Sequence, residues 1–139
     1  MTKSPKIYFY DTGLLCNLLN IRNSIDMKQH YAYGSIFENF VINEFIKAQY
    51  NQGKRKNVYF LRDAKGHEID CVVPKESSYA MYEIKAGSTF SPDFIKNIKY
   101  YAKEDEAGTV IYHWDNSFSL KNASIMQVEK FLASVGELC

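Results

Sequence analysis

The sequence of 139 residues lacks several features that would assign it to a familiar class. No apolar run approaches the roughly 20 residues that a membrane helix needs, and no long apolar signal region follows the first residues. The three cysteines include no C-x-x-C pair, which argues against a disulfide scaffold or a cysteine-based zinc site. These absences predict a cytoplasmic protein with no membrane attachment.

An excess of positive or negative charge is also nearly absent. Lys and Arg total 17 against 16 Asp and Glu, so the net charge is +1. This balance removes the simplest argument for nucleic-acid binding, a strongly basic surface, although a local basic patch is compatible with it. The run Lys54-Arg55-Lys56 is most simply a solvated turn, with a phosphate contact as the less common alternative. No G-x-x-x-x-G-K-[ST] motif is present, so this chain has no P-loop for ATP.

The chain contains enough hydrophobic residues to form a core. Hydrophobic residues make up 46% of it, and it contains 11 tyrosines and 9 phenylalanines. A chain of this length and composition predicts a single folded domain over residues 1–139.

Periodicity predicts alternating helices and strands. Strands are expected at 6–10, 57–61, 68–73, 79–85 and 108–114, and helices at 12–19, 35–50, 91–102 and from 124 to the end. Residues 20–32 are expected to form a loop. Asp11 is expected to cap the first helix, and Ser91 followed by Pro92 is typical of a helix start. The short connections between the middle strands favour an antiparallel meander within a mixed α/β domain.

One glutamate lies on the apolar face of the helix expected at 35–50. Val41, Ile42 and Phe45 follow Glu38 at spacings that share a helix face. A buried carboxylate costs several kcal/mol unless it is compensated. Glu38 is therefore expected either to hydrogen-bond to backbone or pair with Arg62 or a lysine, or to bind a metal ion.

Two expected strands carry further charged residues. Because side chains alternate between the faces of a strand, Glu68, Asp70 and Val72 are expected on one face, and the apolar residues between them on the other. Glu83 and Lys85 share a face of the next strand. If these polar faces match, Asp70, Glu83 and Lys85 converge on one patch. The alternative is an exposed sheet face with weak cross-strand pairs.

Such a group of side chains is suited to phosphodiester chemistry. Mg²⁺ takes carboxylate oxygens and water as ligands, and it lowers the pKa of its water and stabilises charge on a phosphoryl oxygen. The predicted metal ligands are Glu38, Asp70 and Glu83, with Mn²⁺ as a substitute ion. Lys85 is expected to position the attacking water or the phosphate.

These residues resemble the PD-(D/E)xK nuclease-like superfamily. Glu38 on a helix, then Asp70, then Glu83-Ile84-Lys85 follow its pattern, with Ile69 where the proline of the motif would stand. The resemblance implies a restriction-endonuclease-like fold, a mixed central sheet flanked by helices. It also implies that the four residues Glu38, Asp70, Glu83 and Lys85 are catalytic in DNA hydrolysis.

A closer similarity extends over most of the chain. It is to the domain of unknown function at the C-terminus of many bacterial and archaeal AAA-type ATPases. The matching blocks are 5–15, 34–44, 59–63, 66–70 and 83–85. The similarity implies an N-terminal ATPase module, absent from this chain, as the partner. Two functions are expected from it: Mg²⁺-dependent DNA hydrolysis, or a non-catalytic docking or substrate-sensing role for the ATPase with a structural acid cluster.

Overall fold

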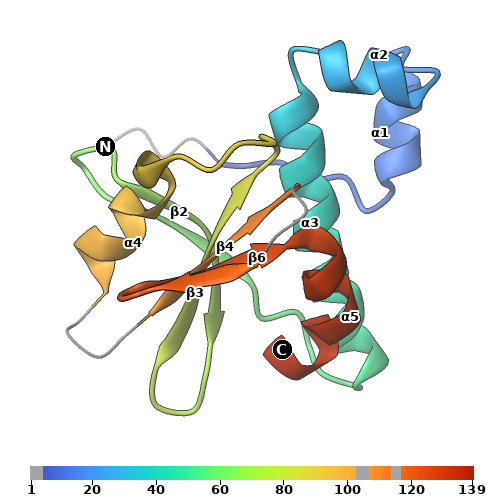
Figure 1. Cartoon of the computed structure of the whole chain (residues 1–139). Helices are drawn as coiled ribbons and strands as arrows, with labels where there is room; N and C mark the ends of the chain where they lie inside the picture. Colours follow the sequence, from blue (N-terminus) through green and yellow to red (C-terminus); the bar gives the residue numbers. More distant parts are fainter. Residues whose placement is uncertain (1–4, 103–106, 114–116) are drawn as a thin grey trace.

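A six-stranded mixed sheet forms the centre of the computed structural model, which describes residues 5–102, 107–113 and 117–139 (Figure 1). The strands lie in the order β1-β2-β3-β4-β6-β5. They are β1 (Tyr59–Arg62), β2 (Glu68–Pro74), β3 (Tyr79–Lys85), β4 (Gly108–Tyr112), β5 (Phe118–Leu120) and β6 (Ala123–Gln127).

The sheet contains both kinds of strand pairing. β1, β2 and β3 form the antiparallel meander predicted from their short connections. β3 then pairs in parallel with β4, and β4 with β6, while β5 runs antiparallel to β6. The parallel step from β3 to β4 requires a crossover, which the helical segment between them provides.

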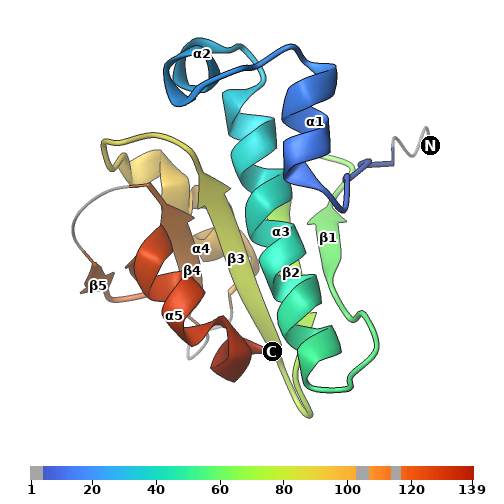
Figure 2. The same ribbon diagram turned by 90° about the vertical axis from the view of Figure 1, so that its right-hand side faces the viewer.

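Helices cover both faces of this sheet. They are α1 (Thr12–Leu18), α2 (Ser24–Gln29), α3 (Tyr33–Asn51), the 3₁₀ turn η1 (Pro92–Ile95), α4 (Lys96–Tyr101) and α5 (Val128–Leu138). Figure 2 shows α3 and α5 side by side along one face, with α1 and α2 near the beginning of α3. Among the described residues, no helix is both long and apolar enough to span a membrane.

The two faces of the sheet carry separate cores. On the face of α3 and α5, Phe45 and Phe131 pack with Ile111 of β4. On the face of η1 and α4, Ile98 packs with Val110 of the same strand. The chain is thus a mixed α/β domain whose sheet is flanked by helices, as the sequence predicted.

Two segments differ from the sequence prediction near the N-terminus. Residues 5–10, which we call the strap, are not a strand. Their backbone is bound by two buried asparagines of α3: Phe9 N–H donates to Asn39 Oδ1 at 2.7 Å, and Asn43 Nδ2 donates to Phe9 O at 2.6 Å. The predicted loop 20–32 contains α2, which Asn23 caps through the N–H groups of Ile25 and Asp26.

The last helix was also misplaced by the sequence prediction. It begins at Val128, whereas residues 123–127 form β6. Ile125 is buried, but it is buried in a strand that pairs with Val110 of β4. A short apolar stretch fits either period, so only the pairing with β4 decides between them. β4 itself ends at Tyr112, and position 114 of the predicted strand lies outside the described residues.

The close packing of α4 on β4 can be tested at Gly108. A Cβ at this position would lie 2.7 Å from Cγ2 of Ile98, whose side chain is fully buried. We expect Gly108→Ala to lower the free energy of unfolding by about 1–3 kcal/mol, measured by urea denaturation. Gly34→Ala is the matched control: it meets no atom within 4 Å in α3 and should stabilise by about 0.5–1 kcal/mol. Equal stability of Gly108→Ala and the wild type would contradict this packing.

Candidate functional site

Asp70, Glu83 and Lys85 meet where β2 and β3 lie side by side. Asp70 Oδ2 accepts a hydrogen bond from Ile84 N–H at 2.9 Å and lies 3.3 Å from Lys85 Nζ. Lys85 Nζ lies 2.5 Å from Glu83 Oε2. One ammonium group therefore links two carboxylates that are thirteen positions apart in the sequence.

A β-bulge in β2 orients Asp70. Three residue steps of β2, from Ile69 to Val72, oppose only two steps of β1. As a result Ile69 and Val72 both pack toward η1 and α4, while Cys71 packs toward α3 and α5. The simple alternation predicted from the sequence, with Val72 on the face of Asp70 and Ile69 on the face of Cys71, is wrong because it omits this extra residue.

Glu83 is the most deeply buried carboxylate at the site, with only 2% of its surface exposed. Its Oε1 accepts a hydrogen bond from Asn97 Nδ2 of α4 at 3.3 Å. Burial, and secondarily the charge of Asp70, raises the pKa of Glu83 to about 7, against the opposing effects of Lys85 and Asn97. Burial by itself would lower the pKa of Lys85, but the carboxylates of Asp70 and Glu83 raise it, so this side chain is an ammonium at neutral pH.

Glu38 lies on α3, as predicted, and is held by the strap. Its Oε1 accepts a hydrogen bond from the Tyr8 hydroxyl at 2.6 Å and lies 3.0 Å from Lys6 Nζ. The same ammonium is 2.5 Å from Glu68 Oε1 and 3.5 Å from Asp70 Oδ1. Of the partners expected for Glu38, the structure thus selects a lysine; Arg62 lies instead near Glu68, at 3.6 Å.

Lys6 and Tyr8 also belong to the site, although the sequence patterns did not identify them. The two residues are separated by one position in an extended segment, so their side chains lie on the same side of the backbone. This spacing is the sequence signal that could have identified them together. Burial would lower the pKa of Lys6, but Glu68 and Glu38 raise it well above its usual range, and burial together with Glu38 raises that of Tyr8. Both groups therefore stay protonated at neutral pH and donate hydrogen bonds to Glu38.

The donor set fits a hard divalent cation in chemistry, since it consists of carboxylate oxygens. In the part of the chain that the structure describes, however, no three His, Cys, Asp or Glu side chains are already grouped around one metal position. The carboxylates are instead separated by ammonium groups: Lys6 among Glu38, Glu68 and Asp70, and Lys85 between Asp70 and Glu83. A cation at this site has to displace one of these ammonium groups, and Asp70 is the residue common to both.

This competition predicts the effect of removing Lys6. We expect Lys6→Met to unfold more easily than the wild type by about 2 kcal/mol in EDTA, because three carboxylates lose their shared ammonium. We also expect Mg²⁺ to stabilise Lys6→Met more than it stabilises the wild type. Tenfold tighter Mg²⁺ binding would add about 1.4 kcal/mol to the free energy of unfolding at saturation. Melting temperatures measured with and without Mg²⁺ test both effects.

The control for that measurement is Lys47→Met. Lys47 pairs on α3 with Glu44, a surface pair away from the site. An equal Mg²⁺ response in Lys6→Met, Lys47→Met and the wild type would show that Lys6 does not compete with a cation.

Comparison with known sequences identifies one protein family and two related proteins that match this chain. Residues 33–131 match a family described as "Domain of unknown function (DUF4143)". The chain is 31% identical over 87 residues to the uncharacterized protein Mb2031c of Mycobacterium bovis and to the uncharacterized protein Rv2008c of Mycobacterium tuberculosis. Each match covers 63% of this chain but only 19% of the relative, so the chain corresponds to a minor part of these proteins. No solved structure shows a significant match.

Proposed function

The chain belongs to the family described as "Domain of unknown function (DUF4143)", and from the geometry of its acidic site we propose that it is a Mg²⁺-dependent phosphodiesterase acting on DNA. The observation that carries this proposal is the grouping of two carboxylates and a lysine around a buried position. Asp70, Glu83 and Lys85 come from two adjacent strands, and Glu38 approaches from α3 through the shared Lys6. The assignment to the PD-(D/E)xK superfamily, with its restriction-endonuclease-like fold, is part of the same proposal.

Each residue of the site has a role in this chemistry. Asp70 and Glu83, with Glu38 as a further ligand, would hold Mg²⁺, which would supply a water of lowered pKa and a positive charge beside a phosphoryl oxygen. Ile84 N–H holds one oxygen of Asp70, and the other oxygen lies 3.5 Å from Lys6 Nζ. Lys85, which lies between Asp70 and Glu83, would hold the attacking water or a phosphate oxygen.

A second function is favoured by Lys6. Its ammonium already neutralises Glu38, Glu68 and Asp70, which is what a purely structural acid cluster would require. On this alternative the domain is a non-catalytic docking or substrate-sensing module for an N-terminal ATPase module. The mycobacterial relatives, which extend far beyond the matched segment, have room for such a module.

DNA cleavage by the purified chain distinguishes the two functions. With Mg²⁺ or Mn²⁺ we expect the wild type to nick DNA and Asp70→Ala to lose at least about 10²-fold in rate. Glu44→Ala, which removes a carboxylate of α3 outside the site, is the matched control and should cleave like the wild type. Equal inactivity of the wild type and Asp70→Ala with every metal, together with no metal-dependent rise in melting temperature, would reject hydrolysis and favour the docking module.

A further inference from the structure

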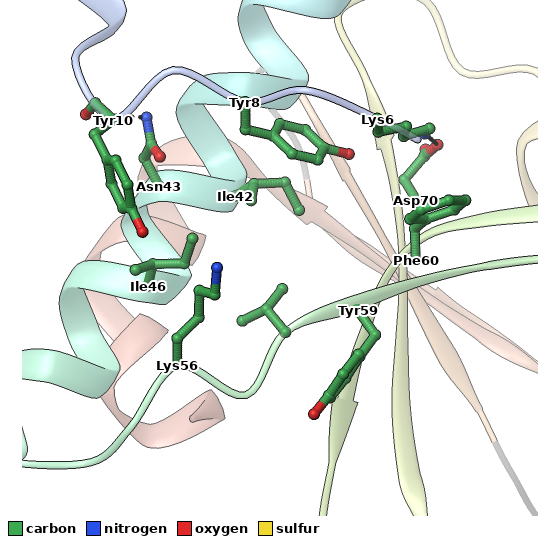
Figure 3. Close-up of a pocket in the computed structure, with 11 residues that line it drawn as sticks. Lys6, Tyr8, Tyr10, Ile42, Asn43, Ile46, Lys56, Tyr59, Phe60 and Asp70 are labelled. Atoms are coloured by element: carbon green, nitrogen blue, oxygen red, sulfur yellow. Dashed lines mark hydrogen bonds and ion pairs between the residues drawn. The ribbon is translucent and has the colours of Figure 1, made fainter. Parts of the chain in front are cut away.

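A cavity of about 400 Å³ opens beside Asp70, between the strap, α3 and the segment leading into β1 (Figure 3). We propose that it binds one unpaired nucleobase of a single-stranded nucleic acid whose backbone passes the acidic site. This inference rests on the proposed function and specifies the form of substrate. We call the cavity the aromatic pocket. The side chains that line it include Tyr8, Tyr10, Phe60, Ile42, Ile46 and Lys56.

The walls of the aromatic pocket have the chemistry of a base-binding site. Ile42 and Ile46 of α3 contribute apolar surface, and the rings of Tyr8 and Tyr10 reach it from the strap. Phe60 lines the opposite side, next to Asp70. Tyr10 is 67% exposed and Phe60 38% exposed, so both present ring surface to solvent around one hollow. Aromatic rings of this kind stack on bases of any sequence.

The charges around the aromatic pocket suit one nucleotide with its phosphates. The ammonium of Lys56 points into the space in Figure 3, and Lys56 makes no ion pair within the described residues. Lys6, at the end near Asp70, is already neutralised by three carboxylates. A phosphate beside the bound base therefore meets Lys56.

Both the position and the charge of the aromatic pocket favour binding of a single strand over binding of a duplex. A base inside a duplex can enter a pocket between a helix and a strand only after it is unpaired. A duplex interface also draws on many cations, whereas the chain has a net charge of +1 and the aromatic pocket offers one free ammonium. The ligand chemistry is that of the base, which DNA and RNA share, so both are compared in the test.

Binding measured in EDTA separates this inference from the proposed hydrolysis, because it needs no metal and no cleavage. We expect a fluorescein-labelled oligothymidylate to bind the full chain, and an oligouridylate to bind similarly, by fluorescence anisotropy. A duplex of the same length should bind at least about tenfold more weakly. Tyr10→Ala and Lys56→Gln should each weaken single-strand binding by about tenfold. Both side chains are largely exposed, and Tyr10 loses only its side-chain hydrogen bond with Tyr50, so each variant should lower the melting temperature only slightly.

The matched control is Tyr79→Ala, which removes an equally exposed tyrosine (63%) from β3, outside the aromatic pocket. It should bind like the wild type. Photo-crosslinking of an oligonucleotide that contains 5-iodouracil should modify Tyr10 or Phe60 and leave Tyr79 unmodified. Equal affinity for duplex and single strand, equal weakening by Tyr79→Ala and Tyr10→Ala, or no binding of any oligonucleotide would overturn the inference, whatever the outcome of the cleavage assay.

Discussion

Replacing Lys85 with methionine is expected to lower the free energy of unfolding by about 3 kcal/mol at pH 8 and by much less at pH 5. The ammonium of Lys85 lies 2.5 Å from Glu83, whose side chain is almost fully buried, and 3.3 Å from Asp70. At pH 8 its loss leaves a charged carboxylate in the core without its main partner. At pH 5 Glu83 carries a proton, so its buried carboxyl no longer needs the ammonium, and the remaining cost comes from the lost pair with Asp70, which keeps Lys6 at 3.5 Å. Urea denaturation at the two pH values in EDTA measures the difference.

The double variant Lys85→Met/Glu83→Gln is the control. It removes both members of the ion pair, and replacing a buried pair as a whole usually costs little. We therefore expect it to recover most of the stability that Lys85→Met loses at pH 8. A double variant as unstable as Lys85→Met would mean that the lysine acts through packing and not through the charge of Glu83.

The buried position of Glu83 also makes the stability of the wild type depend on pH. The ordinary pKa of a glutamate is 4.5, and in the folded chain that of Glu83 is raised to about 7, first by burial and then by Asp70. A group whose pKa rises on folding contributes stability that is fully present below pH 4.5. That contribution is lost as pH rises through about 7. The loss attributable to Glu83 between pH 5 and pH 8 is about 2.5 kcal/mol.

Glu83→Gln isolates this contribution, because its amide does not titrate. We expect the stability of Glu83→Gln relative to the wild type to rise by about 2.5 kcal/mol between pH 5 and pH 8 in EDTA. Glu44→Gln, at a carboxylate for which Lys47 is the partner, is the control and should change little. If the difference between Glu83→Gln and the wild type stays constant with pH, the Glu83 pKa is not raised on folding.

The same titration links pH to metal binding. A protonated Glu83 cannot serve as a metal ligand, so the affinity of the site for Mg²⁺ should fall as pH drops below about 7. On the proposed function, the rate of DNA cleavage falls over the same range for the same reason.

Local sequence patterns were sufficient for most of the secondary structure. Asp11 does cap α1, through a hydrogen bond from Leu14 N–H, and Ser91 caps η1 with Pro92 in the first turn. The long helix α3 and the antiparallel meander are also confirmed. These features depend on side chains within one or two turns of each other, or on strands joined by short connections.

The candidate site was predictable in part. The sequence indicated that Asp70, Glu83 and Lys85 lie on neighbouring strands, and the structure brings them within ion-pair distance. Glu38 was recognised as a carboxylate within an apolar stripe of α3. The sequence did not indicate that Lys6 would stand between Glu38 and Asp70, because both contacts join segments that are more than 30 residues apart in the chain.

By itself the sequence determined the helices α1 and α3, the meander and the identity of the acidic residues, because hydrophobic period and capping act over a few neighbouring residues. Only the tertiary structure decided the bulge beside Asp70, the strand β6 and the position of Lys6 among three carboxylates. Each of these depends on how one segment pairs with another, whether the partner is near in the chain, as for the bulge between β1 and β2, or far from it, as for Lys6 and the three carboxylates. The free energy of such pairing comes from the partner segment, and the local pattern of either segment alone does not contain it.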